Sequence, residues 1–263
     1  MEPINILLSR EELLFVLNEL QADFLPGLDP NPLGDLTADQ QELALAVAER
    51  ALRARELVRR YASGEVVLHN ALLTAVGVCA YAINAILVYH WPAEGDTPVR
   101  YFGHTRGDDV VIHSRPDEVL HLFSLLPSKE QLLNQVLDVC EYEDVTSAEP
   151  FEFAMSGTTF GEAQTLAAGG QADQAIERLV KAGVSRAAAT ALAETLAGSP
   201  KASIVQTINQ PGDGSVQKQD FTLLQNSGPA WLAVASPEEG AAKLQVKTVN
   251  KDELLKSLAE WAL

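Results

Sequence analysis

The residues best suited to chemistry are five histidines, which all fall between positions 69 and 121: His69, His90, His104, His113 and His121. His104 and His113, together with Asp108 and Asp109, surround the turn between two predicted strands. Imidazole and carboxylate groups are common zinc ligands, but the spacing matches no standard zinc pattern. We therefore predict no metal site and expect these histidines to be ordinary surface residues.

Two Asp-Glu pairs are the next candidates for chemistry. Asp117-Glu118 lies in "VVIHSRPDEVLHLFSLL" (110–126), and Asp252-Glu253 lies in "LQVKTVNKDELLKSLAEWAL" (244–263). Paired carboxylates can act as general acid and base. Adjacent helical residues point about 100° apart, however, and acidic residues are favoured in the first turn of a helix. Both pairs therefore predict helix starts, not a catalytic site.

Motifs for catalysis or cofactor binding are absent from the sequence. It contains no G-x-S-x-G, no H-E-x-x-H, no Walker A loop and no G-x-G-x-x-G after a predicted strand. Ser156 in "AMSGTTFGE" has no local partner that would activate it, which favours a loop or a helix cap. We predict a non-enzymatic protein without catalytic residues or cofactors. The alternative is a small-molecule enzyme or ligand-binding domain with a site between two halves of the chain.

Charge excludes two classes of partner. The 263 residues carry a formal net charge of −17. Residues 1–149 hold 24 acidic and 10 basic side chains, a balance of −14, and residues 150–263 hold 12 and 9, a balance of −3. Nucleic acids and anionic membranes both require clustered cations, so neither is expected. A basic partner would be attracted to this surface, although solubility alone explains the charge more simply.

The cellular location follows from the cysteines and the apolar segments. Cys79 and Cys140 make no disulfide framework, and "MEPINILLSREE" lacks the features of a secretory signal. Residues 66–91 carry no Asp, Glu, Lys or Arg. Their histidines and asparagines favour a short helix from Asn70 and a buried strand over 82–90 rather than a membrane span. We expect a cytoplasmic protein with no membrane insertion.

Capping boxes and apolar spacing predict the elements of the first half. Ser9 and Thr37 each begin a capping box, which predicts helices after Ser9 and over about 38–61. We expect the arginines near the end of the second helix to complement its dipole rather than bind an anion; they are Arg50, Arg53, Arg55, Arg59 and Arg60. "VRYFGH" and "DVVIHS" predict paired strands. A helix is expected from Ser114 or Arg115, another over 128–140, and a linker over 141–153.

The second half repeats the order of the first. Helices are expected at 159–169, 171–182 and 185–197, strands at 202–209, 217–225, 229–235 and 243–249, and a helix after Asn250. An offset of 135 pairs Asp117 with Asp252 and Val111 with Val246. This internal echo predicts two related halves, residues 1–145 and 150–263, in a single domain over 1–263. The fold class is α+β, with two pseudo-symmetric halves, each an antiparallel sheet or meander with flanking helices.

The same order resembles the EspG family of type VII (ESX) secretion-associated chaperones. The resemblance rests on "LTADQQELALAVAERA", "EVVLHNALLTAVGVCA", "RYFGHTRGDDVVIHSRPDEVLHLFSLLP" and "RLVKAGVSRAAATALAETLAG", followed by a strand meander and a terminal helix. It implies one α+β domain with pseudo-twofold symmetry and a cytosolic, non-enzymatic chaperone. Such a protein keeps secreted helical clients soluble before export.

The resemblance also implies where a client binds, namely on the sheet and on a loop between early strands. In this chain that loop is the short "HWPAEGDTP", so we take Trp91, Glu94 and Asp96 as candidate partner-binding residues. The first half is expected to have three strands where the second has four, which bears on the type of client. A purely structural module that functions as a homodimer is the third hypothesis.

Overall fold

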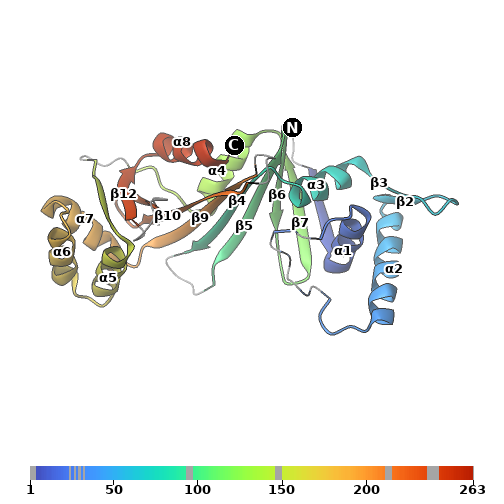
Figure 1. The fold of residues 1–263 in the computed structure, drawn as a ribbon, viewed down its shortest axis with the longest axis horizontal. Coiled ribbons are helices and arrows are strands. Elements are labelled where there is room, and N and C mark those ends of the chain that lie inside the picture. The colour runs from blue at the N-terminus through green and yellow to red at the C-terminus, as the bar shows by residue number, and fades with distance from the viewer. Residues whose placement is uncertain are drawn as a thin grey trace.

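A computed structural model describes residues 4–23, 25–26, 28, 31, 33–92, 97–145, 150–210, 215–235 and 243–262. These residues form an α+β fold around a large antiparallel sheet (Figure 1). The elements, in order, are β1 (Ile4–Ser9), α1 (Arg10–Glu19), α2 (Ala38–Ala54), β2 (Val58–Arg60), β3 (Val66–Leu68), α3 (Asn70–Ala80), β4 (Asn84–Trp91), β5 (Val99–Arg106), β6 (Asp109–Ser114), β7 (Leu120–Leu126), α4 (Lys129–Val139), β8 (Glu152–Ser156), α5 (Gly157–Ala168), α6 (Ala172–Lys181), α7 (Arg186–Ala197), β9 (Lys201–Asn209), β10 (Gln217–Gln225), β11 (Ala230–Ala235), β12 (Lys243–Val249) and α8 (Lys251–Ala262).

Ten strands form one sheet in the order β1-β7-β6-β5-β4-β9-β10-β11-β12-β8, while β2 and β3 form a separate hairpin. The central pair is β4 and β9, which run antiparallel with Val88 opposite Val205. On either side of this pair, the strands follow the same order outward, so that β5 corresponds to β10 and β7 to β12. The fold class predicted from the sequence is therefore confirmed, with one continuous sheet joining the two halves.

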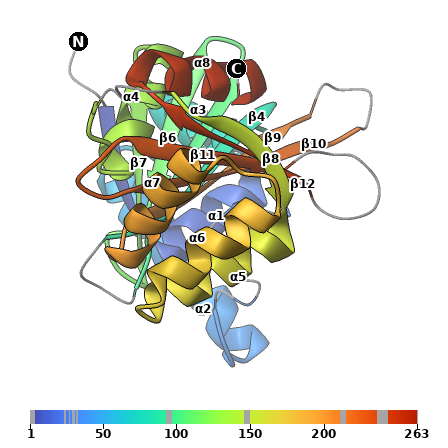
Figure 2. The same cartoon turned by 90° about the vertical axis from the view of Figure 1, so that its left-hand side faces the viewer.

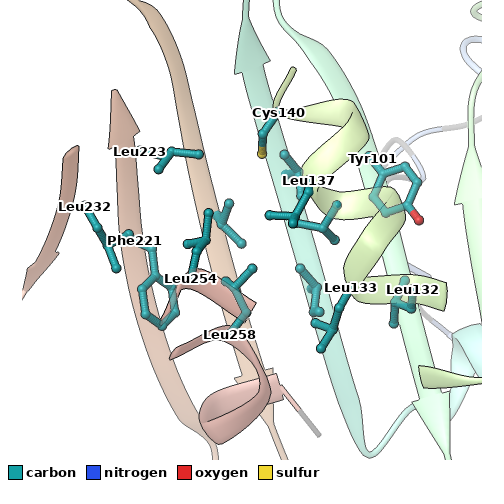
Figure 3. Packing of buried hydrophobic residues seen from close by; sticks show 14 of the residues in the cluster. Tyr101, Leu132, Leu133, Leu137, Cys140, Phe221, Leu223, Leu232, Leu254 and Leu258 are labelled. Carbon is teal, nitrogen blue, oxygen red and sulfur yellow. The ribbon is translucent and has the colours of Figure 1, made fainter. Parts of the chain in front are cut away.

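Helices α4 and α8 cover the middle of one face of the sheet, which we call the helix-pair face. Leu132, Leu133 and Leu137 of α4 pack beside Leu254 and Leu258 of α8 on this face (Figure 3). Beneath them lie inward-pointing side chains of several strands: Ile86, Val88, Tyr101, Val205, Phe221, Leu223 and Leu232. Because this core draws on both halves, it fixes the two central strands against each other.

The opposite face is covered only at its two ends. Near β1 and β7, the side chains of α1 and α3 pack on Val111 and Phe123. At the other end, the alanine-rich helices α5, α6 and α7 pack on Trp231 and Val246. Figure 2 shows α4 and α8 on one side of the sheet and α5–α7 on the other. Figure 1 places α1 and α2 at the far end of the molecule from α5–α7.

Several local predictions from the sequence are confirmed. Ser9 and Thr37 complete the predicted capping boxes of α1 and α2. The uncharged segment 66–91 forms the end of a hairpin, helix α3 and strand β4.

Among the helices of the described residues, none combines the length and the apolar character that a membrane span requires.

The prediction of a helix from Ser114 or Arg115 is wrong. Residues Leu120–Leu126 form β7, which pairs with β1 on one side and β6 on the other. Asp117 is not a helix start. It lies in the loop before β7, where its Oδ1 accepts hydrogen bonds from the backbone N–H groups of Val119 and Leu120. The offset of 135 therefore pairs unlike elements, because Asp252 lies in α8, whose counterpart is α4.

Two other boundaries differ from the prediction. The helix expected over 38–61 ends at Ala54, and residues Val58–Arg60 form β2 instead. The predicted linker 141–153 leads into the edge strand β8, which pairs with β12. With β1 and β8 included, each half contributes five strands to the sheet, so the expected inequality of three and four strands is wrong.

Candidate protein-binding surface

The middle of the sheet face opposite α4 and α8 lies between the two groups of covering helices. Along β4, Ile86 and Val88 point to the helix-pair face, so Leu87 and Tyr89 point to the opposite one. The register continues this row onto β9, where Ile204 lies opposite Tyr89. We name the resulting area the open sheet face; it comprises Leu87, Tyr89, Trp91, Ile204, Gln206, Ile208, Asp220 and Thr222.

Burial along these strands confirms that this area is accessible. Ile204 is 40% exposed, although it lies on a strand at the centre of a ten-stranded sheet. Its β4 neighbours Leu87 and Tyr89 are half-buried. On the other face, the paired residues Val88 and Val205 of the same two strands are 0% and 3% exposed. The difference between the two faces arises because α4 and α8 cover only one of them.

Polar side chains border the apolar centre of the open sheet face. Gln206 Nε2 donates to Asp220 Oδ1 at 2.8 Å, which fixes the amide beside the apolar residues. Arg100 of β5 lies opposite Tyr89 and is exposed. An apolar and aromatic centre with a polar rim is the usual composition of a protein-binding surface.

The three candidate residues from the sequence have different outcomes. Trp91 is the last residue of β4, lies opposite Ala202 and is half-buried at the edge of the open sheet face. Glu94 and Asp96 lie outside the described residues. Ile204 and Tyr89 were missed, because the face they share is defined by the pairing of β4 with β9, which joins distant parts of the chain.

The expectation of surface histidines is wrong for His104 on β5 and His113 on β6. His104, His113 and His121 are 0%, 0% and 1% exposed. His113 Nδ1 lies 3.2 Å from the carbonyl oxygen of Pro26, and its Nε2 lies 2.8 Å from His121 Nδ1. Its ring also stacks on Phe123. These contacts account for the burial of His113 and His121 between the strands and the covering segments.

No group of metal-ligating side chains occurs among the described residues, including those histidines. Burial lowers the pKa values of His104 and His113, because it disfavours the charged form of the imidazole ring. The pKa of His104 falls to about 4, and that of His113 to about 3, with the neighbouring His121 and His104 adding to the effect of burial.

One cluster has the composition of a catalytic triad. His90 Nδ1 lies 2.9 Å from Ser203 Oγ, and His90 Nε2 lies 3.8 Å from Glu141 Oε1. Ser203 and His90 are each 1% exposed, so a substrate cannot reach the hydroxyl in this conformation. Burial also lowers the pKa of His90, despite the opposing effect of Glu141. The cluster therefore joins β4 to β9 beneath α4 rather than forming an accessible nucleophile.

Comparison with solved structures finds a similar overall fold in a known protein. The chain superposes on the Mycobacterium tuberculosis type VII secretion system chaperone EspG5, solved in complex with the PE25–PPE41 dimer. The TM-score is 0.67 at 14% sequence identity, and the match covers 99% of this chain and 97% of the other. The chain has an EspG-like fold.

No protein-family model and no curated protein matches the sequence. The likeness to EspG5 thus concerns the fold, and it extends over almost the whole of both chains. The residues of the open sheet face are identified from the strand pairing in this chain and not from EspG5.

Proposed function

We propose that this protein is a non-enzymatic chaperone or adaptor of the type VII secretion kind, which binds a helical protein client on its open sheet face before export. The observation that carries the proposal is the exposed apolar centre of the sheet around Ile204 and Tyr89. The EspG-like fold supports it, because EspG5 was solved with a PE–PPE dimer bound. We place this activity in the cytoplasm, where the client is made.

The physical basis is the burial of apolar surface that two proteins would otherwise expose to water. An amphipathic helix presents a stripe of apolar side chains, and β4 and β9 offer a matching surface in Leu87, Tyr89, Ile204 and Ile208. Covering such a client stripe prevents its association with other chains, which is what a chaperone must achieve. The rim formed by Gln206 and Asp220 provides hydrogen-bonding groups that orient the client.

Affinity purification of the full chain from its native host, followed by mass spectrometry, tests the proposal. We expect to recover a small helical secreted protein, encoded near a type VII ATPase. The variant Ile204→Asp should lose the client, because a carboxylate placed at the centre of the apolar surface would be desolvated on binding. The expected decrease in recovered client is at least about tenfold.

Leu43→Asp is the matched control, since Leu43 is 61% exposed on α2, far from β4 and β9. This variant should retain the client. Equal recovery with the Ile204→Asp and Leu43→Asp variants would contradict the proposed surface. A co-purifying metabolite in place of any stable protein partner would contradict the chaperone function itself and favour the ligand-binding alternative.

A further inference from the structure

A second surface lies at the end of the molecule formed by α2 and the β2–β3 hairpin (Figure 1). The end of α2 and strand β2 enclose an open hollow of about 740 Å³. It is lined by Arg50, Arg53, Ala54, Glu56, Val58, Arg59, Arg60 and Tyr61. Four guanidinium groups thus line one hollow of a protein whose formal net charge is −17.

The arginines of this region fall into two groups according to their partners. Arg55 is committed to the fold, since it binds Glu12 at 3.1 Å and donates to the carbonyl oxygen of Leu7 at 2.7 Å. Arg60 is also held in place, because its Nε and Nη2 donate to the two carboxylate oxygens of Glu49 at 2.6 and 2.8 Å. The sequence predicts that these arginines complement the helix dipole, but α2 ends at Ala54, and Arg60 lies on β2, where it pairs with Glu49 instead.

The remaining three arginines keep most of their donors available. Arg50 donates from Nε to the carbonyl oxygen of Ala46, and Arg53 lies 3.7 Å from Glu49 in an exposed ion pair. The guanidinium of Arg59 has no partner in the described part of the chain, and the residue is exposed on β2. In the hollow, the hairpin side is formed by Arg59, Arg60 and Tyr61, and the α2 side by Arg50 and Arg53.

A smaller hollow of about 250 Å³ continues from the first one along the hairpin. It shares Glu56, Val58, Arg59 and Tyr61 with the first hollow and ends at His69 and Asn70, where α3 begins. The first turn of α3 contains no acidic residue. The positive end of this helix dipole is therefore not offset locally, and it adds to the attraction for an anion.

We propose that these two hollows form a basic groove that binds an acidic segment of a partner protein. Guanidinium groups pair with carboxylates in a bidentate geometry, and the exposed Tyr61 offers an apolar contact to the intervening side chains. A segment with a few carboxylates matches the donors that Arg50, Arg53 and Arg59 keep available. A nucleic acid presents a long row of phosphates, which the acidic remainder of this protein would repel.

This inference goes beyond the proposed chaperone function and concerns a different surface. The groove is at the α2 end of the molecule, whereas the open sheet face lies on the paired strands β4 and β9 in its middle (Figure 1). The two surfaces therefore share no residue. Glu56 lines both hollows, so its carboxylate opposes an anionic ligand and limits the affinity.

Fluorescence anisotropy with a labelled octaglutamate peptide tests the groove on the full chain at low salt. We expect saturable binding that weakens as salt rises. The triple variant Arg50→Ala/Arg53→Ala/Arg59→Ala should bind at least about tenfold more weakly. Glu56→Gln should bind about threefold more tightly, because it removes the opposing carboxylate. Arg59→Gln, which breaks no ion pair, replaces the triple variant if the latter does not fold.

The matched control is Arg178→Ala/Arg186→Ala, which removes two exposed arginines that pair with Glu162 and Glu177 on the α5–α7 bundle. It should bind the peptide within about twofold of the unmodified chain. Failure of the unmodified chain to bind octaglutamate, or equal loss in both sets of variants, would overturn the proposal. Tighter binding of a single-stranded oligonucleotide than of octaglutamate would overturn it in favour of a nucleic-acid ligand.

Discussion

Buried histidines couple the stability of this protein to pH. His104 and His113 are neutral in the folded protein at physiological pH, because burial lowers their pKa values to about 4 and about 3. After burial, the neighbouring His121, His104 and Arg115 also disfavour the protonation of His113, while the Pro26 carbonyl oxygen favours it. In the unfolded chain a histidine titrates near pH 6.5. Below that pH the unfolded state therefore binds more protons than the folded state does.

The free energy of unfolding should consequently fall as the pH is lowered from 6.5 to 4.5. Each such histidine contributes a slope of up to about 1.4 kcal/mol per pH unit in this range. His104→Leu should reduce the slope, as measured by urea denaturation at several pH values. His69→Asn is the control, because His69 is exposed and asparagine preserves the cap of α3. An unchanged slope in the His104→Leu variant would contradict this account.

At the scale of elements, the contact between β5 and α4 depends on Gly103. A Cβ atom at this position would overlap Cδ1 of Leu132, which is 0% exposed in the core of the helix-pair face. The glycine thus allows α4 to lie close to the sheet. Because Leu132 is enclosed on all sides, its side chain has little room to move away.

We expect Gly103→Ala to lower the free energy of unfolding by about 1–3 kcal/mol through overpacking. Leu132→Val, which shortens the opposing side chain, should lower it by less than about 1.5 kcal/mol alone and should recover part of the loss in the double variant. Chemical denaturation of the four proteins measures this coupling. Strictly additive effects would show that the two side chains do not compete for the same space.

Helices with caps were predictable from the sequence, whereas one strand with both faces covered was not. Ser9 and Thr37 initiate α1 and α2 by short-range hydrogen bonds, which the sequence pattern records directly. Leu120–Leu126 lies between covering helices on both faces, so its residues are apolar without clear alternation. Such a run is indistinguishable from a buried helix by periodicity alone. Its partner β1 was also not predicted, so nothing in the sequence indicated the pairing.

The open sheet face illustrates the same limit for the site. Trp91 was predicted as a partner-binding residue from its position next to a loop, and it lies at the edge of the face. Tyr89 and Ile204 lie 115 positions apart in the sequence but opposite each other in the sheet. Their exposure depends on where α1 and α5–α7 stop covering the strands. Such long-range pairing leaves no local pattern in the sequence.

At the scale of the whole molecule, both halves build one sheet, and their helices cover its faces unequally. The pair α4 and α8 closes one face, while α1, α3 and α5–α7 cover only the ends of the other. The edge strand β1 is partly shielded as well, since Arg55 donates to the carbonyl oxygen of Leu7. This contact disfavours association through the β1 edge.

Site-specific photo-crosslinking tests the central claim most directly. A photoreactive phenylalanine analogue is placed at position 204 in one version of the chain and at position 43 in another, each expressed in the native host. The account predicts that position 204 crosslinks to a helical secreted protein and that position 43, which is more exposed but remote from the sheet face, does not. A crosslink to the client from position 43, with none from position 204, would contradict the account.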